Sequence, residues 1–297
     1  MASRSSTVFL SFGQAENQQI LILIVESGST KADWVIINNG AVEQTFLTPG
    51  LNPFSNKEYA DVIRKTVAVR IGELPIDTVY FYGAGIVGTK EKRAIAEAFG
   101  YLDRTKVTVN DDLIAAAIAT CGNDKGVVCI LGTGSNIGYY DGREIVAKVA
   151  SGGYLLGSEG SGMALGREVL KMYIRDQLSA RSVRLLESAY DISKENIFDK
   201  VYNQNVINRY VASFAPMVHK LEITEKEKIT QRVFTEFLDE RILKLEASRS
   251  NPIHFVGSIA YSFRQEIEDI LKNNNLALGN IVDKPIDNLV EYHTLNN

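Results

Sequence analysis

The sequence predicts an α/β protein of two similar lobes, with a helical insert in the second lobe. Strand-like apolar runs recur up to residue 149, whereas 163–250 has the spacing of long helices. The stretches that begin at Ile20 and at Val127 share one pattern of strand, polar glycine turn, strand, hairpin turn and strand. A chain of 297 residues that is 45% hydrophobic can bury the cores of two lobes.

The first copy of the pattern opens with six uninterrupted apolar residues, Ile20–Val25, which predict a buried strand. The turn 26–31 follows. Trp34–Ile37 and Ala41–Leu47 are expected to be strands, because a tight hairpin signal at Asn38–Gly40 separates them.

Between the two copies, helical spacing and β-branched runs alternate. Helices are expected at Lys57–Ile71, Thr89–Phe99 and Leu113–Thr120, and strands at Thr78–Tyr82 and Val107–Asn110.

The second copy has strands at Val127–Leu131, Ile137–Tyr140 and Glu144–Val149, with its hairpin turn at 141–142. After it, the composition predicts helices. They are expected at Met163–Leu178, after a capping box at Thr224–Glu227, and at Ile259–Leu271 behind a strand at Ile253–Val256.

These elements place the N-terminal lobe at 20–112 and the C-terminal lobe at 113–297, with the helical insert at about 163–250. Residues 1–19 are polar and are expected to be a disordered extension, because their one apolar run is too short for a signal-peptide core.

Charge and cysteine content exclude several classes of partner. A net charge of −4 argues against a nucleic-acid or anionic-membrane surface, and no apolar run reaches transmembrane length. Cys121 and Cys129 provide neither a disulfide framework nor a zinc site, which favours a reducing, cytoplasmic environment.

Two polar turns in equivalent positions, 26–31 and 132–136, are the main functional signal. Each offers backbone N–H groups with Ser or Thr hydroxyls at the end of a strand, which suits a polyphosphate held between two lobes. Either turn alone would be an ordinary hairpin loop. Glu26 could hold Mg²⁺, directly or through water.

Asp111 and Asp112 follow a strand and precede a helix. At least one of them is expected to cap that helix. A carboxylate facing the phosphate turns could also act as the base of a phosphoryl transfer, and the sequence leaves open which of the two does so. In the glycine-dense loop 152–162, Glu159 either binds a sugar hydroxyl or fixes its own loop.

The segment Gly83–Gly88 has the spacing G-x-G-x-x-G between a strand and a helix, with Asp111 at the end of the next strand. A dinucleotide site would carry this motif on the first strand of its unit. A glycine turn for close helix–strand packing is therefore the favoured interpretation.

Taken together, these motifs resemble the N-acetylglucosamine kinase family, which shares a domain with the benzoyl-CoA reductase activator ATPases in the actin, hexokinase and Hsp70 superfold. The similarity covers nearly all of 20–293. The segments 26–31 and 132–136 are similar to the two phosphate motifs, and 110–111 is similar to the catalytic aspartate segment. The segment 255–260 is similar to the adenosine motif, and 50–53 to the sugar-contacting loop. The segment 285–293 resembles the family's C-terminus.

The resemblance implies duplicated ribonuclease H-like (actin-like ATPase) domains with an interdomain cleft, and a last helix that packs back on the N-terminal lobe. It implies transfer of the γ-phosphate of ATP, with Mg²⁺, to the 6-hydroxyl of an amino sugar, first of all N-acetylglucosamine. Asp111 would be the base, and Gly83–Gly88 would connect the two domains. The residues implied for ATP are Ser29, Thr30, Lys31, Gly132, Thr133, Gly134, Gly257 and Ser258. Those implied for the sugar are Asn52, Ser135, Asn136, Gly153 and Glu159. The family also allows a homodimer.

The chain departs from the family pattern in the glycine-dense loop. Ser158 replaces an acid in the usual Gly-Asp-Glu-Gly-Ser, and Tyr154 stands where Trp is frequent. The iron–sulfur cysteines of the reductase activators have no counterpart here. Two alternatives remain: an ATP-binding or ATPase protein of this fold that acts as a sensor or activator, and a dinucleotide-dependent oxidoreductase.

Overall fold

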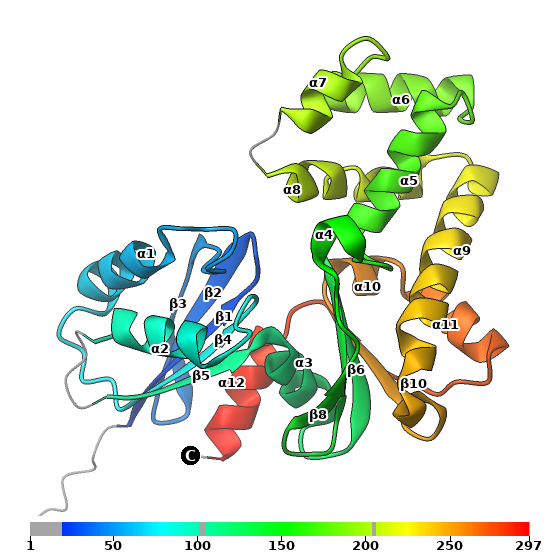
Figure 1. The fold of residues 1–297 in the computed structure, drawn as a ribbon. Helices are drawn as coiled ribbons and strands as arrows, with labels where there is room; N and C mark the ends of the chain where they lie inside the picture. The colour runs from blue at the N-terminus through cyan, green and yellow to red at the C-terminus, as the bar shows by residue number, and fades with distance from the viewer. Residues whose placement is uncertain (1–19, 101–104, 204–205, 297) are drawn as a thin grey trace, which may run out of the picture.

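Two five-stranded sheets form the two lobes of the computed structural model (Figure 1). The structure describes residues 20–100, 105–203 and 206–296. The extension expected at 1–19 lies outside these ranges. None of the helices in the described ranges is long and apolar enough to cross a membrane.

The N-terminal sheet has the order β3-β2-β1-β4-β5. β1 (Leu21–Ser27), β2 (Lys31–Asn38) and β3 (Ala41–Pro49) form an antiparallel meander, and β4 (Thr78–Gly83) and β5 (Lys106–Asp111) continue it in parallel with β1. Because β1 is central, its apolar residues are buried on both faces of the sheet.

The C-terminal sheet has the order β10-β9-β6-β7-β8. β6 (Gly126–Leu131), β7 (Ser135–Tyr140) and β8 (Ile145–Lys148) are antiparallel neighbours, whereas β9 (Ile253–Val256) and β10 (Leu278–Val282) run parallel to β6. This is the topology of the N-terminal sheet repeated strand for strand. The predicted duplication into two actin-like, ribonuclease H-like lobes is therefore confirmed.

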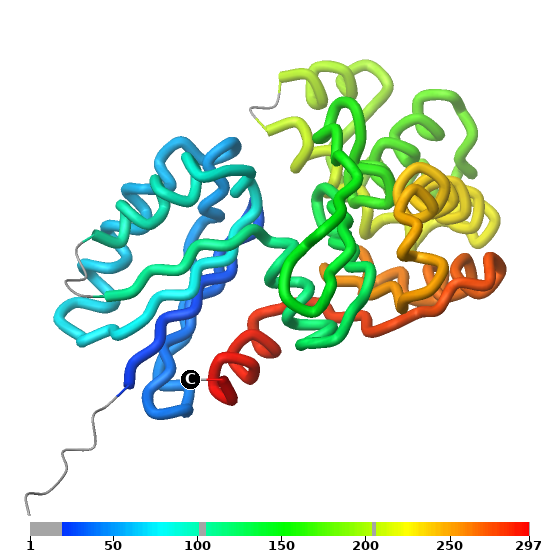
Figure 2. The backbone as a smooth tube through the Cα atoms, turned by 60° about the horizontal axis from the view of Figure 1, so that its bottom comes forward, coloured from blue at the N-terminus to red at the C-terminus, as the bar shows by residue number. Residues whose placement is uncertain are grey.

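Two helices lie between the sheets (Figures 1 and 2). α3 (Asp112–Cys121) contacts strands of both sheets, and α12 (Ile286–Leu295) packs on α3, β1 and β2. Leu289 of α12 is fully buried beside Ile22 and Ile24. The C-terminal segment is thus part of the core of the N-terminal lobe.

The opposite face of the N-terminal sheet is covered by α1 (Tyr59–Thr66), a π-helical turn at Val67–Ile71 and α2 (Thr89–Ala98). The buried Trp34 packs there against aromatic rings, with its centroid 6.0 Å from that of Phe99. The helix predicted at 57–71 therefore begins two residues later and changes to π geometry in its last turn.

The insert follows β8 and forms the largest hydrophobic cluster together with the C-terminal sheet. Its helices are α4 (Gly153–Leu156), α5 (Gly162–Ile174), α6 (Ala180–Tyr190), α7 (Ile197–Tyr202), α8 (Ile207–Ala212), a 3₁₀ segment (Ala215–Lys220), α9 (Ile223–Glu240) and two 3₁₀ turns (Ile242–Lys244 and Glu246–Arg249). α5 ends four residues before the predicted Leu178.

Two predictions for the C-terminal part were wrong. The capping box of α9 is formed by Glu222 and Glu225, whose side chains each bond the other's backbone, and not by Thr224 and Glu227. The single helix expected at 259–271 is broken at Phe263 into α10 (Ser258–Ser262) and α11 (Arg264–Asn273). Strand β10, which follows α11, had not been predicted.

Candidate active site

Both predicted phosphate turns lie at the same end of their sheets, one between β1 and β2 and the other between β6 and β7 (Figure 1). In the described part of the chain, the amides of Ser29, Thr30, Thr133 and Gly134 have no hydrogen-bond acceptor. Exposed donors at a strand end favour a bound anion. The two turns can therefore both donate to a polyphosphate.

The second turn also anchors helix α5. The amides of Gly162 and Met163 donate to the carbonyls of Gly132 and Thr133, at 2.8 and 3.1 Å. Beside it, the hydroxyl of Ser135 is buried and has no hydrogen-bond partner among the described residues. Because a buried unpaired hydroxyl is costly, Ser135 fits a role in ligand binding.

The nucleoside motif lies next to this turn. Gly257 has φ +117°, and a Cβ there would lie 2.4 Å from the carbonyl oxygen of Leu131 at the end of β6. Ser258 is the first residue of α10. The structure therefore brings both residues to the end of β6, beside the second phosphate turn.

The loop after β3 joins the first phosphate turn. The Asn52 amide donates to the Ser29 hydroxyl (3.2 Å), and the Gly50 amide donates to the Thr30 carbonyl (3.0 Å). Lys31 lies just beyond this turn, with its ammonium 3.9 Å from the Asp33 carboxylate. Asn52, predicted to bind the sugar, is thus placed beside the turn predicted to bind phosphate.

The segment Gly83–Gly88 connects β4 to α2 within the N-terminal lobe, so the expectation that it joins the two domains was wrong. Gly85 has φ +81°, and a Cβ there would lie 2.3 Å from the Asn52 side-chain oxygen. The glycine is needed because Asn52 packs directly against the backbone. The expected close packing of a helix on a strand is thus not what Gly85 provides; it allows close approach of the loop that carries Asn52.

Asp111 caps α3, as expected for one of the two carboxylates. Its Oδ1 accepts from the Ile114 amide (3.0 Å), and its Oδ2 forms an ion pair with Lys148 of β8. It also borders a cavity of about 600 Å³ whose lining comes from both lobes but includes neither phosphate turn. The cavity is lined by Lys92, Asn110, Asp111, Ile114, Ile118, Asn123, Tyr140, Gly142, Arg143, Glu144, Ile145, Lys148 and Tyr292.

Asp112 faces a different group of residues. Its Oδ1 lies 3.4 Å from the Asn136 amide nitrogen, across the two lobes. Burial and the neighbouring Asp111 carboxylate raise the pKa of Asp112 to about 6. Burial, together with Asp33 and Asp112, raises the pKa of Glu26 to about 8.

This group of carboxylates fits a magnesium ion. Burial first, and then the charges of Asp33 and Asp112, raise the pKa of Glu26, so a cation there would stabilise the ionised carboxylate. Within the described residues, no three His, Cys, Asp or Glu side chains form a metal cluster. Mg²⁺ needs only one or two carboxylates when phosphates and water complete its shell, so the site suits Mg²⁺ bound with a nucleotide.

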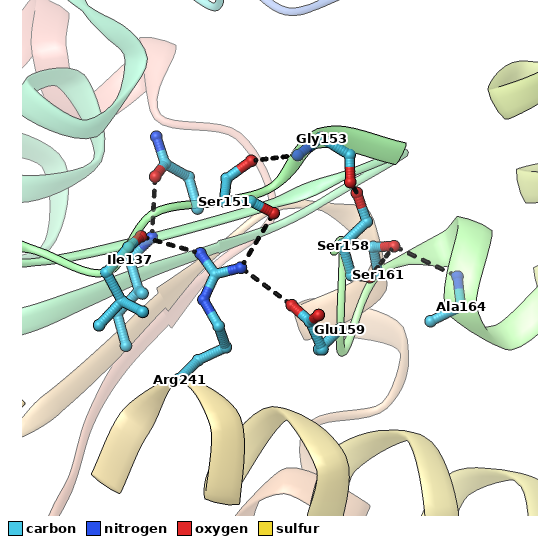
Figure 3. A network of polar contacts seen from close by, with 10 residues as sticks. Ile137, Ser151, Gly153, Ser158, Glu159, Ser161, Ala164 and Arg241 are labelled. Atoms are coloured by element: carbon cyan, nitrogen blue, oxygen red, sulfur yellow. Dashed lines mark hydrogen bonds and ion pairs between the residues drawn. The ribbon is translucent and has the colours of Figure 1, made fainter. Parts of the chain in front are cut away.

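The glycine-dense loop is held by a buried arginine (Figure 3). Arg241 is 2% exposed, and its guanidinium donates to the Glu159 carboxylate (2.9 Å) and to the carbonyls of Ser151 (3.4 Å) and Val149 (3.2 Å). Of the two roles considered for Glu159, fixing its own loop is therefore the one that the geometry favours.

Ser158 lies in the same loop with φ +66°, and its hydroxyl donates to the carbonyl of Gly153 (3.0 Å). Gly153 is the first residue of α4 and also has positive φ. The Ser158 hydroxyl thus forms a hydrogen bond within its own loop. Serine in place of the family's usual acid therefore removes a charge and adds this contact with Gly153.

Sequence reasoning missed three cations at this site: Lys148, Arg209 and Arg241. Their partners Asp111, Ser29 and Glu159 lie 37, 180 and 82 positions away in the chain. No local pattern in the sequence could have indicated these pairs.

A family model described as the BadF/BadG/BcrA/BcrD ATPase family matches residues 25–289. The chain belongs to this family. A solved structure from Porphyromonas gingivalis, provisionally assigned as an N-acetylglucosamine kinase, is 36% identical with a TM-score of 0.85, over 93% of this chain and 99% of that one. The family and this relative agree with the resemblance seen in the sequence.

Two further relatives have lower sequence identity to this chain. An N-acetylmuramic acid/N-acetylglucosamine kinase of Clostridium acetobutylicum is 24% identical over 245 residues, 76% of this chain and 78% of that protein. A structure from Chromobacterium violaceum, also assigned provisionally as an N-acetylglucosamine kinase, has a TM-score of 0.66 at 14% identity, over 92% of this chain and 98% of that one, and shows the fold alone.

Proposed function

We propose that this protein is an ATP-dependent kinase that phosphorylates the 6-hydroxyl of an amino sugar, with N-acetylglucosamine as the first candidate. One observation carries the proposal: two turns with unpaired amides, one from each lobe, stand at the same end of their sheets. The names of the relatives from P. gingivalis and C. acetobutylicum support the same substrate class.

In this proposal Asp111 is the base. Its Oδ1 is held by the helix cap, so Oδ2, which pairs with Lys148, would take the hydroxyl proton as the oxygen attacks the γ-phosphorus. Lys148 forms an ion pair with this carboxylate. Such a base contributes roughly 10² to 10⁴ in rate, and positioning and electrostatics supply the rest.

The remaining residues hold the two substrates. The amides of Ser29, Thr30, Thr133 and Gly134 would bind the phosphates, and Gly257 and Ser258 would lie near the nucleoside. Glu26 would hold Mg²⁺, which would neutralise charge on the phosphate oxygens.

The sugar would contact Asn52, Ser135, Asn136 and Gly153; Asn52 bonds the first phosphate turn, and Asn136 bonds Asp112, the neighbour of Asp111. Glu159 would act indirectly through the loop that carries Gly153. We place the enzyme in the cytoplasm, in line with its two unpaired cysteines, Cys121 and Cys129.

The test is ADP release from Mg·ATP in the presence of N-acetylglucosamine, N-acetylmuramic acid, glucosamine, N-acetylmannosamine or glucose. Stimulation by one sugar, with the phosphate found on its 6-oxygen by NMR, is the expected result. ATP binding without stimulation by any of the sugars would instead support the sensor or activator alternative, which the self-bonded Ser158 favours.

A further inference from the structure

A guanidinium from the helical insert reaches the first phosphate turn. Arg209 of α8 donates from Nη2 to the carbonyl oxygen of Ser29, 180 residues earlier in the chain. Two other side-chain hydrogen bonds join the C-terminal lobe to the cleft side of the N-terminal lobe, from Asn136 and Lys148. Arg209 is thus a residue of the helical insert that hydrogen-bonds the N-terminal lobe.

The guanidinium of Arg209 forms no ion pair with any carboxylate that the structure describes. Its Nε is buried without an acceptor, and its Nη2 donates to a backbone carbonyl. A partly buried guanidinium with unused donors is costly unless an anion completes it. Its planar fork matches the oxygens of a phosphoryl group.

The position of Arg209 is fixed by packing. α8 lies against α5 so closely that a Cβ on Gly166 would be 1.9 Å from the carbonyl oxygen of Val211. α5 starts at the second phosphate turn, where the Gly162 amide donates to Gly132. Packing and hydrogen bonds thus connect the second turn to α5 and α5 to α8, which carries Arg209. Arg209 in turn contacts the first turn.

The point of contact adjoins the segments proposed for both substrates. Ser29 belongs to the first phosphate turn, and its hydroxyl accepts from Asn52 of the loop proposed for the sugar. Arg209 therefore contacts the phosphate turn next to the proposed sugar loop.

We propose that Arg209 binds the γ-phosphoryl oxygens of ATP and stabilises the charge on them during transfer, as a catalytic residue supplied by the helical insert; this inference rests on the proposed function. In the step, the bond from the acceptor oxygen to phosphorus forms while the bond from phosphorus to the ADP oxygen breaks. The hydroxyl proton passes to Asp111. Arg209 donates hydrogen bonds to the non-bridging oxygens and keeps its own protons.

The experiment compares Arg209→Ala and Arg209→Lys with the wild-type protein. We expect Arg209→Ala to lower sugar-stimulated ADP release about 10³-fold, and free guanidinium ion to restore part of it. By calorimetry, its affinity for Mg·ATP falls roughly tenfold while its affinity for Mg·ADP is unchanged. Arg209→Lys retains an intermediate rate because it keeps the charge but loses the fork.

Arg181→Ala is the matched control, since Arg181 belongs to the same insert but makes an exposed ion pair with Glu222. It should match the wild type in every assay. Arg209→Ala with wild-type turnover, or with an equal loss of ATP and ADP affinity and no rescue by guanidinium, would overturn the inference. If the wild type shows no sugar-stimulated turnover, the proposed function fails, but the ATP and ADP affinities still decide the role of Arg209.

Discussion

The carboxylate of Asp111 serves two purposes at once. Oδ1 caps α3, which orients the side chain, and Oδ2 is paired with Lys148 on the far lobe. Asp112, one residue later, accepts a hydrogen bond from Asn136, and its charge acts on Glu26. The two adjacent acids therefore have different hydrogen-bond partners, which is consistent with the proposal that Asp111 is the base.

Asp111→Asn tests this assignment. Asparagine remains a good helix cap, so the fold should be kept while the base is lost. We expect sugar-dependent turnover to fall by about 10²- to 10⁴-fold, with ATP affinity nearly unchanged. Turnover and ATP binding are measured on the same samples. If Asp112→Asn abolishes turnover and Asp111→Asn does not, the base is Asp112.

The contacts of Asp111 differ in whether the sequence could predict them. The capping role of Asp111 could be predicted because it depends on a neighbour three positions away. The pairing with Lys148 and the contact of Arg209 with Ser29 could not be predicted, because they depend on how the two lobes meet.

Among the elements, the loop 150–162 depends most on a distant residue. Arg241 stands at the end of α9 and binds three groups on that loop or just before it. Gly157 and Gly160 let the loop pack tightly, since added Cβ atoms would lie 1.9 Å from the Ser151 carbonyl oxygen and 2.7 Å from the Phe237 ring. The loop is therefore shaped by the insert before any sugar binds.

Arg241→Met should destabilise the protein by about 3–5 kcal/mol, because it leaves the Glu159 carboxylate partly buried without its partner. The double variant Arg241→Met with Glu159→Gln should regain much of this loss. Unfolding in urea measures both. If Glu159→Gln alone leaves stability unchanged but raises the KM for the sugar, Glu159 contacts the substrate and is not mainly a loop residue.

Elements with strong local signals were predicted well, and those with weak signals were not. The apolar runs of β1 and β6 gave their positions, and the repeated strand and turn pattern gave the duplication. β10 has only partly buried or exposed residues, so it lacks an apolar run. The Glu222 cap of α9 was missed because sequence rules favour Ser or Thr at that position.

Helix α12, near the end of the chain, packs on the N-terminal lobe. His293 is 4% exposed, its Nε2 lies 2.7 Å from the Tyr82 hydroxyl oxygen, and its ring stacks on Tyr80 with centroids 3.7 Å apart. Because α12 also packs on α3, which contacts both sheets, this junction couples the folding of the two lobes.

The junction should make stability depend on pH. Burial lowers the pKa of His293 from 6.5 to about 4, so the folded protein resists protonation that the unfolded chain accepts. Stability from this residue is therefore complete above pH 6.5 and is lost as the pH falls toward 4. Between pH 7 and pH 5 the loss should be about 2 kcal/mol.

The free energy of unfolding in urea, measured at both pH values, checks this expectation against His293→Gln. Glutamine has no charge to gain and can still bond the Tyr82 hydroxyl, so the variant should lose about 2 kcal/mol less than the wild type on acidification. An equal loss in both proteins would assign the acid sensitivity to other groups. A smaller loss in the variant would show that the neutral, buried His293 holds α12, and with it the end of the C-terminal half, on the N-terminal sheet.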